Sequence, residues 1–313
     1  MKIFGIVMAC LLLLALLYMV IAYFCFRTAA RRGKAANIDK LIASPKYEKY
    51  RDELTAGVNY ARSLPYEDVY ITSSDGLCLH AKVFRAENAH GAAVLFHGYR
   101  SDYGYFDFSL IIRKYIEKGI NLLLTDQRAH GESEGKYIGF GVKERGDCLL
   151  WAKEATRIFE GQPLILEGLS MGATTVLMAS GDDLPPQVKG IIADCGFTSP
   201  AAILSEVIRK DYHVPPALIL PAMNIWFRLL AGYDISEYST AQALAKCRLP
   251  VLFIHGMADD FVPYRMGEEN AAAFSGDKTF ISVEGAGHGL SYLVDRDRCD
   301  DALNAFLAKT LGA

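Results

Sequence analysis

The sequence lacks the patterns by which metal ions and nucleic acids are usually bound. Its cysteines are an odd number with no C-x-x-C pair and no metal-ligand spacing, and they lie far apart at Cys10, Cys25, Cys78, Cys148, Cys195, Cys247 and Cys299. The net charge is only −3, and no basic run follows residue 34. We therefore expect no nucleic-acid partner and no cysteine-bound metal, and we expect reduced thiols, as at a cytosolic face.

Charge is absent from a long stretch at the N-terminus. Residues 3–26 are an uncharged, mostly apolar run of 24 residues, which would span about 36 Å as a helix and so cross a bilayer. A cleaved signal peptide is the alternative, but its apolar region is normally about 7 to 15 residues long. We predict a transmembrane anchor over 1–26 that contacts the lipid bilayer through residues 3–26.

The charges on either side of this run predict its orientation. Lys2 and the amino terminus precede it, whereas four basic residues follow within eight positions: Arg27, Arg31, Arg32 and Lys34. Positive charge is retained on the cytoplasmic side of a membrane. The rest of the chain is therefore predicted to be cytoplasmic.

Residues 27–64 are predicted to join the anchor to the main domain. Residues 35–42 are expected to form a short polar tether, and Ser44-Pro45 supplies an N-cap and a first-turn proline for a helix to about Ser63. Apolar residues of that helix share one face, namely Tyr47, Tyr50, Leu54, Val58 and Ala61. We expect this face to pack on the domain; a role at the membrane surface is the alternative.

From residue 65 to 313, short apolar runs alternate with helical stretches. An antiparallel hairpin is predicted over 69–84. Further strands are expected at 92–96, 120–125, 163–169, 188–193, 251–254 and 279–283, and helices at 105–118, 143–159, 173–180 and 299–311. This alternation predicts an α/β fold with a mostly parallel central sheet covered by helices.

One segment interrupts the alternation. Nearly sixty residues, rich in proline and large apolar side chains, separate the strands at 188–193 and 251–254. An insertion of this length and composition, at about 197–246, predicts a helical cap over the strand ends, where it would shape an apolar pocket. The alternative is that its helices belong to the ordinary core, and both can hold.

The pattern G-x-S-x-G follows the apolar run at 163–169, as Gly168-Leu169-Ser170-Met171-Gly172. Glycines at both ends permit a tight strand-to-helix turn, so Ser170 can present its hydroxyl from a nucleophile elbow. A serine hydroxyl is a weak nucleophile near neutral pH. It needs a base within hydrogen-bond reach and a third group that orients the base.

His288 is the predicted base, because it lies in a glycine-rich loop after the last strand, where an imidazole can reach the carboxyl edge of the sheet. Asp259 is the predicted acid, since it follows the strand at 251–254 and completes the chain order serine, aspartate, histidine. Asp260 and Asp194 remain alternatives for the acid.

A tetrahedral intermediate also requires hydrogen-bond donors for its oxyanion. The elbow supplies the backbone N–H of Met171, and His97-Gly98 allows a sharp turn that would aim the N–H of Tyr99 into the site. We expect His97 to be a structural hydrogen-bonding residue and Arg100 to be solvated.

These motifs together resemble the α/β-hydrolase family of serine hydrolases, close to its esterase, lipase and serine-aminopeptidase-like branch. The matching segments are His97-Gly98-Tyr99, Asp126-Gln127-Arg128-Ala129-His130-Gly131-Glu132-Ser133, Gly168-Leu169-Ser170-Met171-Gly172, Asp259-Asp260-Phe261-Val262-Pro263 and Gly287-His288. The resemblance covers about residues 65–312. It implies that the segment at 126–131 supports the elbow, with Ala129 where relatives usually have glycine, and it favours Asp259 over Asp194 as the acid.

We therefore expect a membrane-anchored serine hydrolase that cleaves a carboxylic ester, lipid-like or with a medium-length acyl chain, through an acyl-enzyme on Ser170. This reaction requires no metal or organic cofactor. Three alternatives remain open: a serine aminopeptidase or amide hydrolase, an acyltransferase that uses an alcohol in place of water, and a catalytically silent membrane-tethered binding protein.

Overall fold

Alternate side chains of the central strands enter two separate hydrophobic cores. In the computed structural model, which describes residues 2–34, 37–101 and 104–312, Ala93 and Leu95 belong to one core, whereas Val94 and Phe96 belong to the other. Successive residues of a strand point to opposite faces of its sheet. Both faces are therefore buried, which explains why the strands are continuous apolar runs in the sequence.

The sheet contains eight strands. They are β1 (Glu67–Thr72), β2 (Cys78–Phe84), β3 (Gly91–Phe96), β4 (Ile120–Thr125), β5 (Leu164–Leu169), β6 (Val188–Asp194), β7 (Val251–Gly256) and β8 (Lys278–Val283). Their spatial order is β1-β2-β4-β3-β5-β6-β7-β8. Strand β2 pairs antiparallel with β1 and β4, and every other neighbouring pair is parallel. The predicted α/β fold and its opening hairpin are confirmed.

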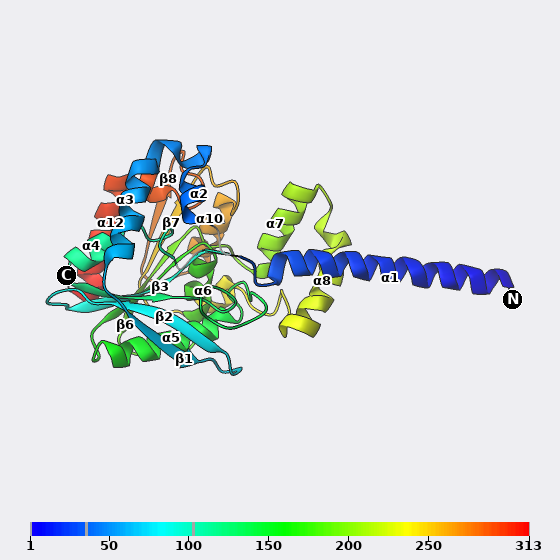
Figure 1. Cartoon of the computed structure of the whole chain (residues 1–313), viewed down its shortest axis with the longest axis horizontal. Coiled ribbons are helices and arrows are strands. Elements are labelled where there is room, and N and C mark those ends of the chain that lie inside the picture. Colours follow the sequence, from blue (N-terminus) through cyan, green and yellow to red (C-terminus); the bar gives the residue numbers. More distant parts are fainter. Residues whose placement is uncertain (1, 35–36, 102–103, 313) are drawn as a thin grey trace.

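Helices cover the two faces of the sheet (Figure 1). The core on one face includes residues of α2 (Ile38–Ile42), η1 (Pro45–Tyr50), α3 (Arg51–Ser63), α4 (Ile112–Glu117), α11 (Ser291–Val294) and α12 (Arg296–Leu311). The core on the other face includes residues of α5 (Glu144–Ile158), α6 (Met171–Ala179), α9 (Thr240–Leu244) and α10 (Tyr264–Ala273).

The insertion after β6 is helical, as predicted, and it lies beside the N-terminal helix. Besides α9 it contains α7 (Pro200–Tyr212), the 3₁₀ turn η2 (Pro216–Leu218), α8 (Leu220–Trp226) and the π-helical turn η3 (Phe227–Ala231). Helix α1 (Lys2–Ala30) projects from the domain, and its C-terminal part runs between α7 and α8 (Figure 1). A third hydrophobic cluster joins α1 to this cap.

The N-terminal connection differs from its sequence interpretation. The stretch expected as a polar tether begins with residues 35–36, which lie outside the described residues, but 38–42 form α2, capped by the Asn37 side chain. Ile38 and Ile42 are buried there, because they are four positions apart and share one helical face. The helix predicted from Pro45 is divided into η1 and α3, and its apolar face packs on the domain as expected.

Candidate active site

Ser170 occupies a strained turn between β5 and α6. Its backbone has φ +56° and ψ −114°, a region that residues other than glycine rarely adopt. Its N–H donates a 2.8 Å hydrogen bond to the carbonyl oxygen of Asp194, at the end of β6. The strain persists because such contacts fix the turn, and strained backbone of this kind is concentrated at functional sites.

The two glycines of the turn are required by close approach. A Cβ at Gly168 would lie 2.1 Å from the carbonyl carbon of Gly172, and one at Gly172 would lie 1.7 Å from the carbonyl oxygen of Phe96. No side chain fits at either distance. The backbone of the elbow therefore packs directly against β5 and the end of β3.

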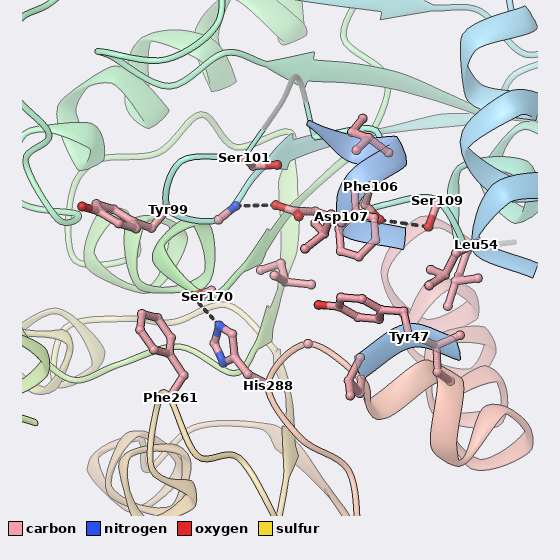
Figure 2. Close-up of a pocket in the computed structure, with 18 of the residues that line it drawn as sticks. Tyr47, Leu54, Tyr99, Ser101, Phe106, Asp107, Ser109, Ser170, Phe261 and His288 are labelled. Carbon is pink, nitrogen blue, oxygen red and sulfur yellow. Dashed lines mark hydrogen bonds between the residues drawn. The ribbon is translucent and has the colours of Figure 1, made fainter. Parts of the chain in front are cut away.

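Ser170, His288 and Asp259 form a continuous chain of hydrogen bonds. The Oγ of Ser170 lies 2.9 Å from Nε2 of His288 (Figure 2), and Nδ1 of His288 lies 2.7 Å from Oδ2 of Asp259. A carboxylate can only accept, so Nδ1–H donates to it and Nε2 is left to accept from the serine hydroxyl. The structure thus brings the three predicted residues together in the geometry of a nucleophile, a base and an orienting acid.

The environment of Asp259 keeps it ionised. Burial alone would raise the pKa of this carboxyl, but hydrogen bonds with His255 and His288 and the N–H of Phe261 outweigh burial and hold the pKa well below its ordinary value. The second oxygen, Oδ1, accepts from the N–H groups of Phe261 and Val262, both at 2.9 Å. An ionised carboxylate at this position stabilises a protonated imidazole.

Neither of the two alternative acids is hydrogen-bonded to His288 among the described residues. The Asp260 carboxylate is exposed and lies 3.2 Å from Nζ of Lys210. Asp194 is buried, which raises the pKa of its carboxyl to about 6, and its Oδ1 has no partner in the described part of the chain. Only Asp259, of these three candidates, is hydrogen-bonded to His288.

The loop after β3 brings Tyr99 beside the elbow. A Cβ at Gly98 would lie 3.6 Å from Cβ of Ser170, so the loop passes directly beside the serine. The N–H of Gly98 is occupied by Oδ2 of Asp107 at 2.6 Å (Figure 2). Among the described residues no acceptor takes the N–H of Tyr99 or of Met171, so both remain available for a substrate oxyanion.

A buried polar network fixes this loop. Nδ1 of His97 bonds to the carbonyl oxygen of Gly98 at 2.7 Å, and its Nε2 accepts from the N–H of Gln127 at 3.1 Å. The Gln127 side chain also bonds to the carbonyl of His97 and accepts from Oγ1 of Thr175, in α6. His97 is therefore structural, as expected, and the segment at 126–131 supports the elbow. Ala129, at the usual glycine position, has φ +62°.

The sequence analysis predicted that Arg100 is solvated, but in the structure its guanidinium is hydrogen-bonded to the protein. Its guanidinium donates to the carbonyl oxygens of Thr28, at 2.6 Å, and Arg31, at 3.3 Å. The hydroxyl of Tyr99 donates to the carbonyl oxygen of Ala29 at 2.7 Å. The last carbonyls of a helix lack partners within the helix, and the active-site loop supplies donors for them.

Two apolar cavities meet at Ser170. The smaller, of about 310 Å³, is shown in Figure 2 and is lined on one side by the N-terminal connection, through Ile38, Leu41, Tyr47 and Leu54. The larger, of about 620 Å³, lies between α1 and the cap. Both volumes fall within the range of small-molecule sites, about 300 to 1,000 Å³. The sequence analysis did not identify these residues as part of a cavity. It predicted that the apolar face of the helix at 47–61 is buried on the domain, but not that this face lies beside Ser170.

One group of potential metal ligands exists among the described residues. Ligand atoms of Cys195, Asp259 and His288 lie within 4.8 Å of one another. Burial raises the pKa of the Cys195 thiol well above its ordinary value, whereas a metal ligand must be the thiolate. Asp259 and His288 are already bonded to each other, so this cluster is poorly suited to a metal ion.

The sheet and the Ser-His-Asp arrangement are those of an α/β hydrolase. Residues 87–231 match the family model described as serine aminopeptidase, S33, and residues 235–311 match the model of TAP-like proteins. The chain belongs to the α/β-hydrolase family, a family of hydrolases, as the resemblance of its motifs implied.

Several curated relatives share part of the chain. An uncharacterized protein of Bacillus subtilis is 31% identical over 198 residues, which are 62% of this chain and 64% of that protein, so the match spans less than two thirds of its length. An α/β-hydrolase domain-containing protein of Arabidopsis thaliana is 27% identical over 72% of this chain and 73% of its own. An uncharacterized membrane protein of Saccharomyces cerevisiae is 25% identical over 65% of this chain and 66% of its own.

Solved structures share the fold at low identity. An esterase from Pyrococcus furiosus has a TM-score of 0.64 and 18% identity, covering 90% of this chain and 98% of its own. A Butyrivibrio proteoclasticus protein solved with ferulic acid has a TM-score of 0.60 and 18% identity over 78% of this chain and all of its own. A puromycin-hydrolyzing peptidase of Mycobacterium tuberculosis has a TM-score of 0.61 and 20% identity, covering 80% of this chain and 40% of its own.

Proposed function

We propose that this protein is a membrane-anchored serine hydrolase that cleaves a carboxylic ester through an acyl-enzyme on Ser170. The observation that carries the proposal is the hydrogen-bonded chain from Ser170 through His288 to Asp259. A serine in contact with an imidazole whose far nitrogen is held by an ionised carboxylate is an activated nucleophile.

The reaction proceeds by two acyl transfers. As Oγ of Ser170 attacks the ester carbonyl, Nε2 of His288 takes the hydroxyl proton, and the N–H groups of Tyr99 and Met171 stabilise the oxyanion. The bond to the alcohol oxygen then breaks, and His288 gives its proton to that oxygen. Water repeats the sequence on the acyl-enzyme, releasing the acid and restoring the serine.

The surroundings of Ser170 favour an ester with apolar groups on both sides of the scissile bond. The two cavities that meet at the serine are lined largely by apolar side chains of the cap, α1 and the N-terminal connection. Such walls bind hydrocarbon by removing it from water. The alternative of amide or aminopeptidase activity is supported by the description of the matching family model.

The helix α1 is proposed to be a retained anchor. It is long and apolar enough to cross a membrane, and Phe26, near its C-terminal end, is buried against the domain. A signal peptide is removed from the mature protein, and removal here would expose that packing surface.

The basic residues after the span support a cytoplasmic location for the domain, if the anchor is retained. A protease added to intact cells should then leave the domain uncut. Rapid digestion of the domain would reverse the proposed orientation.

Covalent labelling tests the catalytic proposal. The full-length protein in detergent is treated with a fluorophosphonate probe, as wild type, Ser170→Ala and Ser63→Ala, the last being an exposed serine outside the site. We expect labelling in wild type and Ser63→Ala and none in Ser170→Ala. Absence of labelling in the folded wild type would favour a silent binding protein. Assays of esters against aminoacyl amides, with and without added alcohol, then separate esterase, aminopeptidase and acyltransferase.

A further inference from the structure

The C-terminal half of α1 is part of the folded domain. The ring of Phe26 is 1% exposed and lies 4.8 Å, centroid to centroid, from that of Phe227 in η3. Nε1 of Trp226 donates to the carbonyl oxygen of Met19 at 3.0 Å. Farther out, the hydroxyl of Tyr18 donates to a main-chain carbonyl in η2 at 2.8 Å. Contacts with the cap therefore extend along α1 from Tyr18 to its end.

The free part of α1 is too short to cross a bilayer alone. Residues 3–17 are all exposed, and as a helix they span about 22 Å, whereas the hydrocarbon core of a bilayer is about 30 Å thick. Residues 18–23 must complete the span. The part of the cap that packs beside them therefore lies at the depth of the hydrocarbon boundary.

The surface of the cap beside α1 is apolar, as expected for a segment at the hydrocarbon boundary of a bilayer. Large apolar side chains are exposed on the turns and helices that flank α1, namely Tyr212, Val214, Leu218, Ile225, Leu229 and Leu230. Apolar side chains gathered around a membrane-spanning helix are suited to insertion into the headgroup and acyl boundary. In a chain anchored through α1, this end of the cap would therefore lie against lipid.

The larger cavity reaches this same end. Its wall on one side is α1, through Tyr18, Ile21, Cys25, Thr28 and Ala29, and it extends to Ser170. Tyr18 and Ala29 are eleven positions apart, or about 16 Å along the helix. Three lining residues at this end are largely exposed, namely Ile21 at 49%, Tyr212 at 59% and Leu218 at 61%. The cavity is therefore open at the end where α1 and the cap leave the domain, within the predicted membrane span.

We propose that the cavity between α1 and the cap binds the hydrocarbon chain of a membrane lipid ester, which enters sideways from the bilayer and presents its carbonyl to Ser170. This inference rests on the proposed function and assigns its substrate class. The anchor helix is then one wall of the substrate site as well as an attachment to the membrane. The smaller cavity accommodates the group on the other side of the scissile bond.

Chain-length dependence tests the role of α1. The full-length protein in phosphatidylcholine nanodiscs is assayed with butyryl and palmitoyl esters, as wild type, Ile21→Trp and Val20→Trp. Val20 is the matched control, because it is the exposed neighbour of Ile21 and does not line the cavity. We expect Ile21→Trp to lower kcat/KM for the palmitoyl ester about tenfold or more, with the butyryl ester and both activities of Val20→Trp changed less than about twofold. An unchanged palmitoyl preference in Ile21→Trp would overturn the proposal.

Photo-crosslinking tests the cavity without catalysis. Ser170→Ala in nanodiscs receives a palmitoyl ester with a diazirine at the end of its acyl chain. Ile203 and Leu204 line the cavity and are each only 4% exposed, so a chain outside the protein cannot reach them. Crosslinks at these residues are expected, and crosslinks confined to exposed residues such as Leu14 would refute the site. Absence of fluorophosphonate labelling in the folded wild type would refute the catalytic proposal and leave this binding result standing.

Discussion

The guanidinium of Arg100 donates a 2.6 Å hydrogen bond to the carbonyl oxygen of Thr28. Arg100 directly follows the proposed oxyanion donor Tyr99, and Thr28 lies in the last turn of α1. A cation at this end of a helix also interacts favourably with the helix dipole. Helix α1 and the loop after β3 are therefore one structural unit, and a change in either should affect the other.

Replacement of Arg100 should weaken this unit. We expect Arg100→Ala to lower the free energy of unfolding by about 1 to 3 kcal/mol, as for hydrogen bonds to charged groups, and to reduce ester turnover. Arg85→Ala is the control, because Arg85 is exposed and pairs with the exposed Glu67, so little change is expected. Thermal unfolding and turnover in nanodiscs measure both effects; equal stability of the two variants would show that the contact with α1 contributes nothing.

The choice of acid can be tested by three matched substitutions. Asp259→Asn should reduce kcat by about 10⁴-fold, because the amide no longer favours the correct imidazole tautomer. Asp260→Asn should retain nearly full turnover, since Asp260 is exposed and pairs with Lys210. Asp194→Asn should lose far less than Asp259→Asn. A larger loss at Asp194 would assign the orienting role to that residue.

The elbow glycine provides a steric test. Gly172→Ala places a methyl group 1.7 Å from a backbone oxygen of β3, so we expect loss of turnover and a strong decrease in stability. Gly146→Ala is the matched control: it lies within α5, where an added Cβ meets nothing within 4 Å, and alanine favours a helix by about 1 kcal/mol. Soluble yield and thermal unfolding would distinguish the two, and an active, stable Gly172→Ala would contradict the geometry of the turn.

Glu167 predicts a dependence of stability on pH. Burial beneath the elbow raises the pKa of this carboxyl to about 8, from about 4.3 in an unfolded chain. Between these values the folded state holds a proton that the unfolded state has lost, so stability falls as pH rises, by up to about 1.4 kcal/mol per pH unit. Glu167→Gln should gain stability relative to wild type over this window.

The control for this pH profile is Glu87→Gln, at an exposed position. Its free energy of unfolding should run parallel to that of wild type from pH 5 to 8. Denaturant unfolding at several pH values measures the difference. A Glu167→Gln profile parallel to wild type would mean that Glu167 is ionised in the folded protein.

Much of the site was predictable because local chemistry fixes it. The glycines of G-x-S-x-G permit a sharp turn after a strand, and residues just beyond parallel strands gather at one edge of the sheet. Ser170, Asp259 and His288 were therefore identifiable as neighbours from their places after β5, β7 and β8. Arg100 was misjudged because its acceptors, Thr28 and Arg31, lie at the end of α1 and just after it, some seventy residues earlier in the chain.

The sequence by itself determined the α/β sheet, the elbow and the apolar span, since each follows from a pattern of residues that are close together in the chain. Only the tertiary structure decided that α1 is a wall of the larger cavity at Ser170. Tyr18 and Leu218 are 200 residues apart, and a contact over that separation leaves no periodic pattern in the chain. Apolar side chains on α1 satisfy a bilayer and a protein cavity equally well, so composition cannot distinguish the two, and packing against the cap makes the choice.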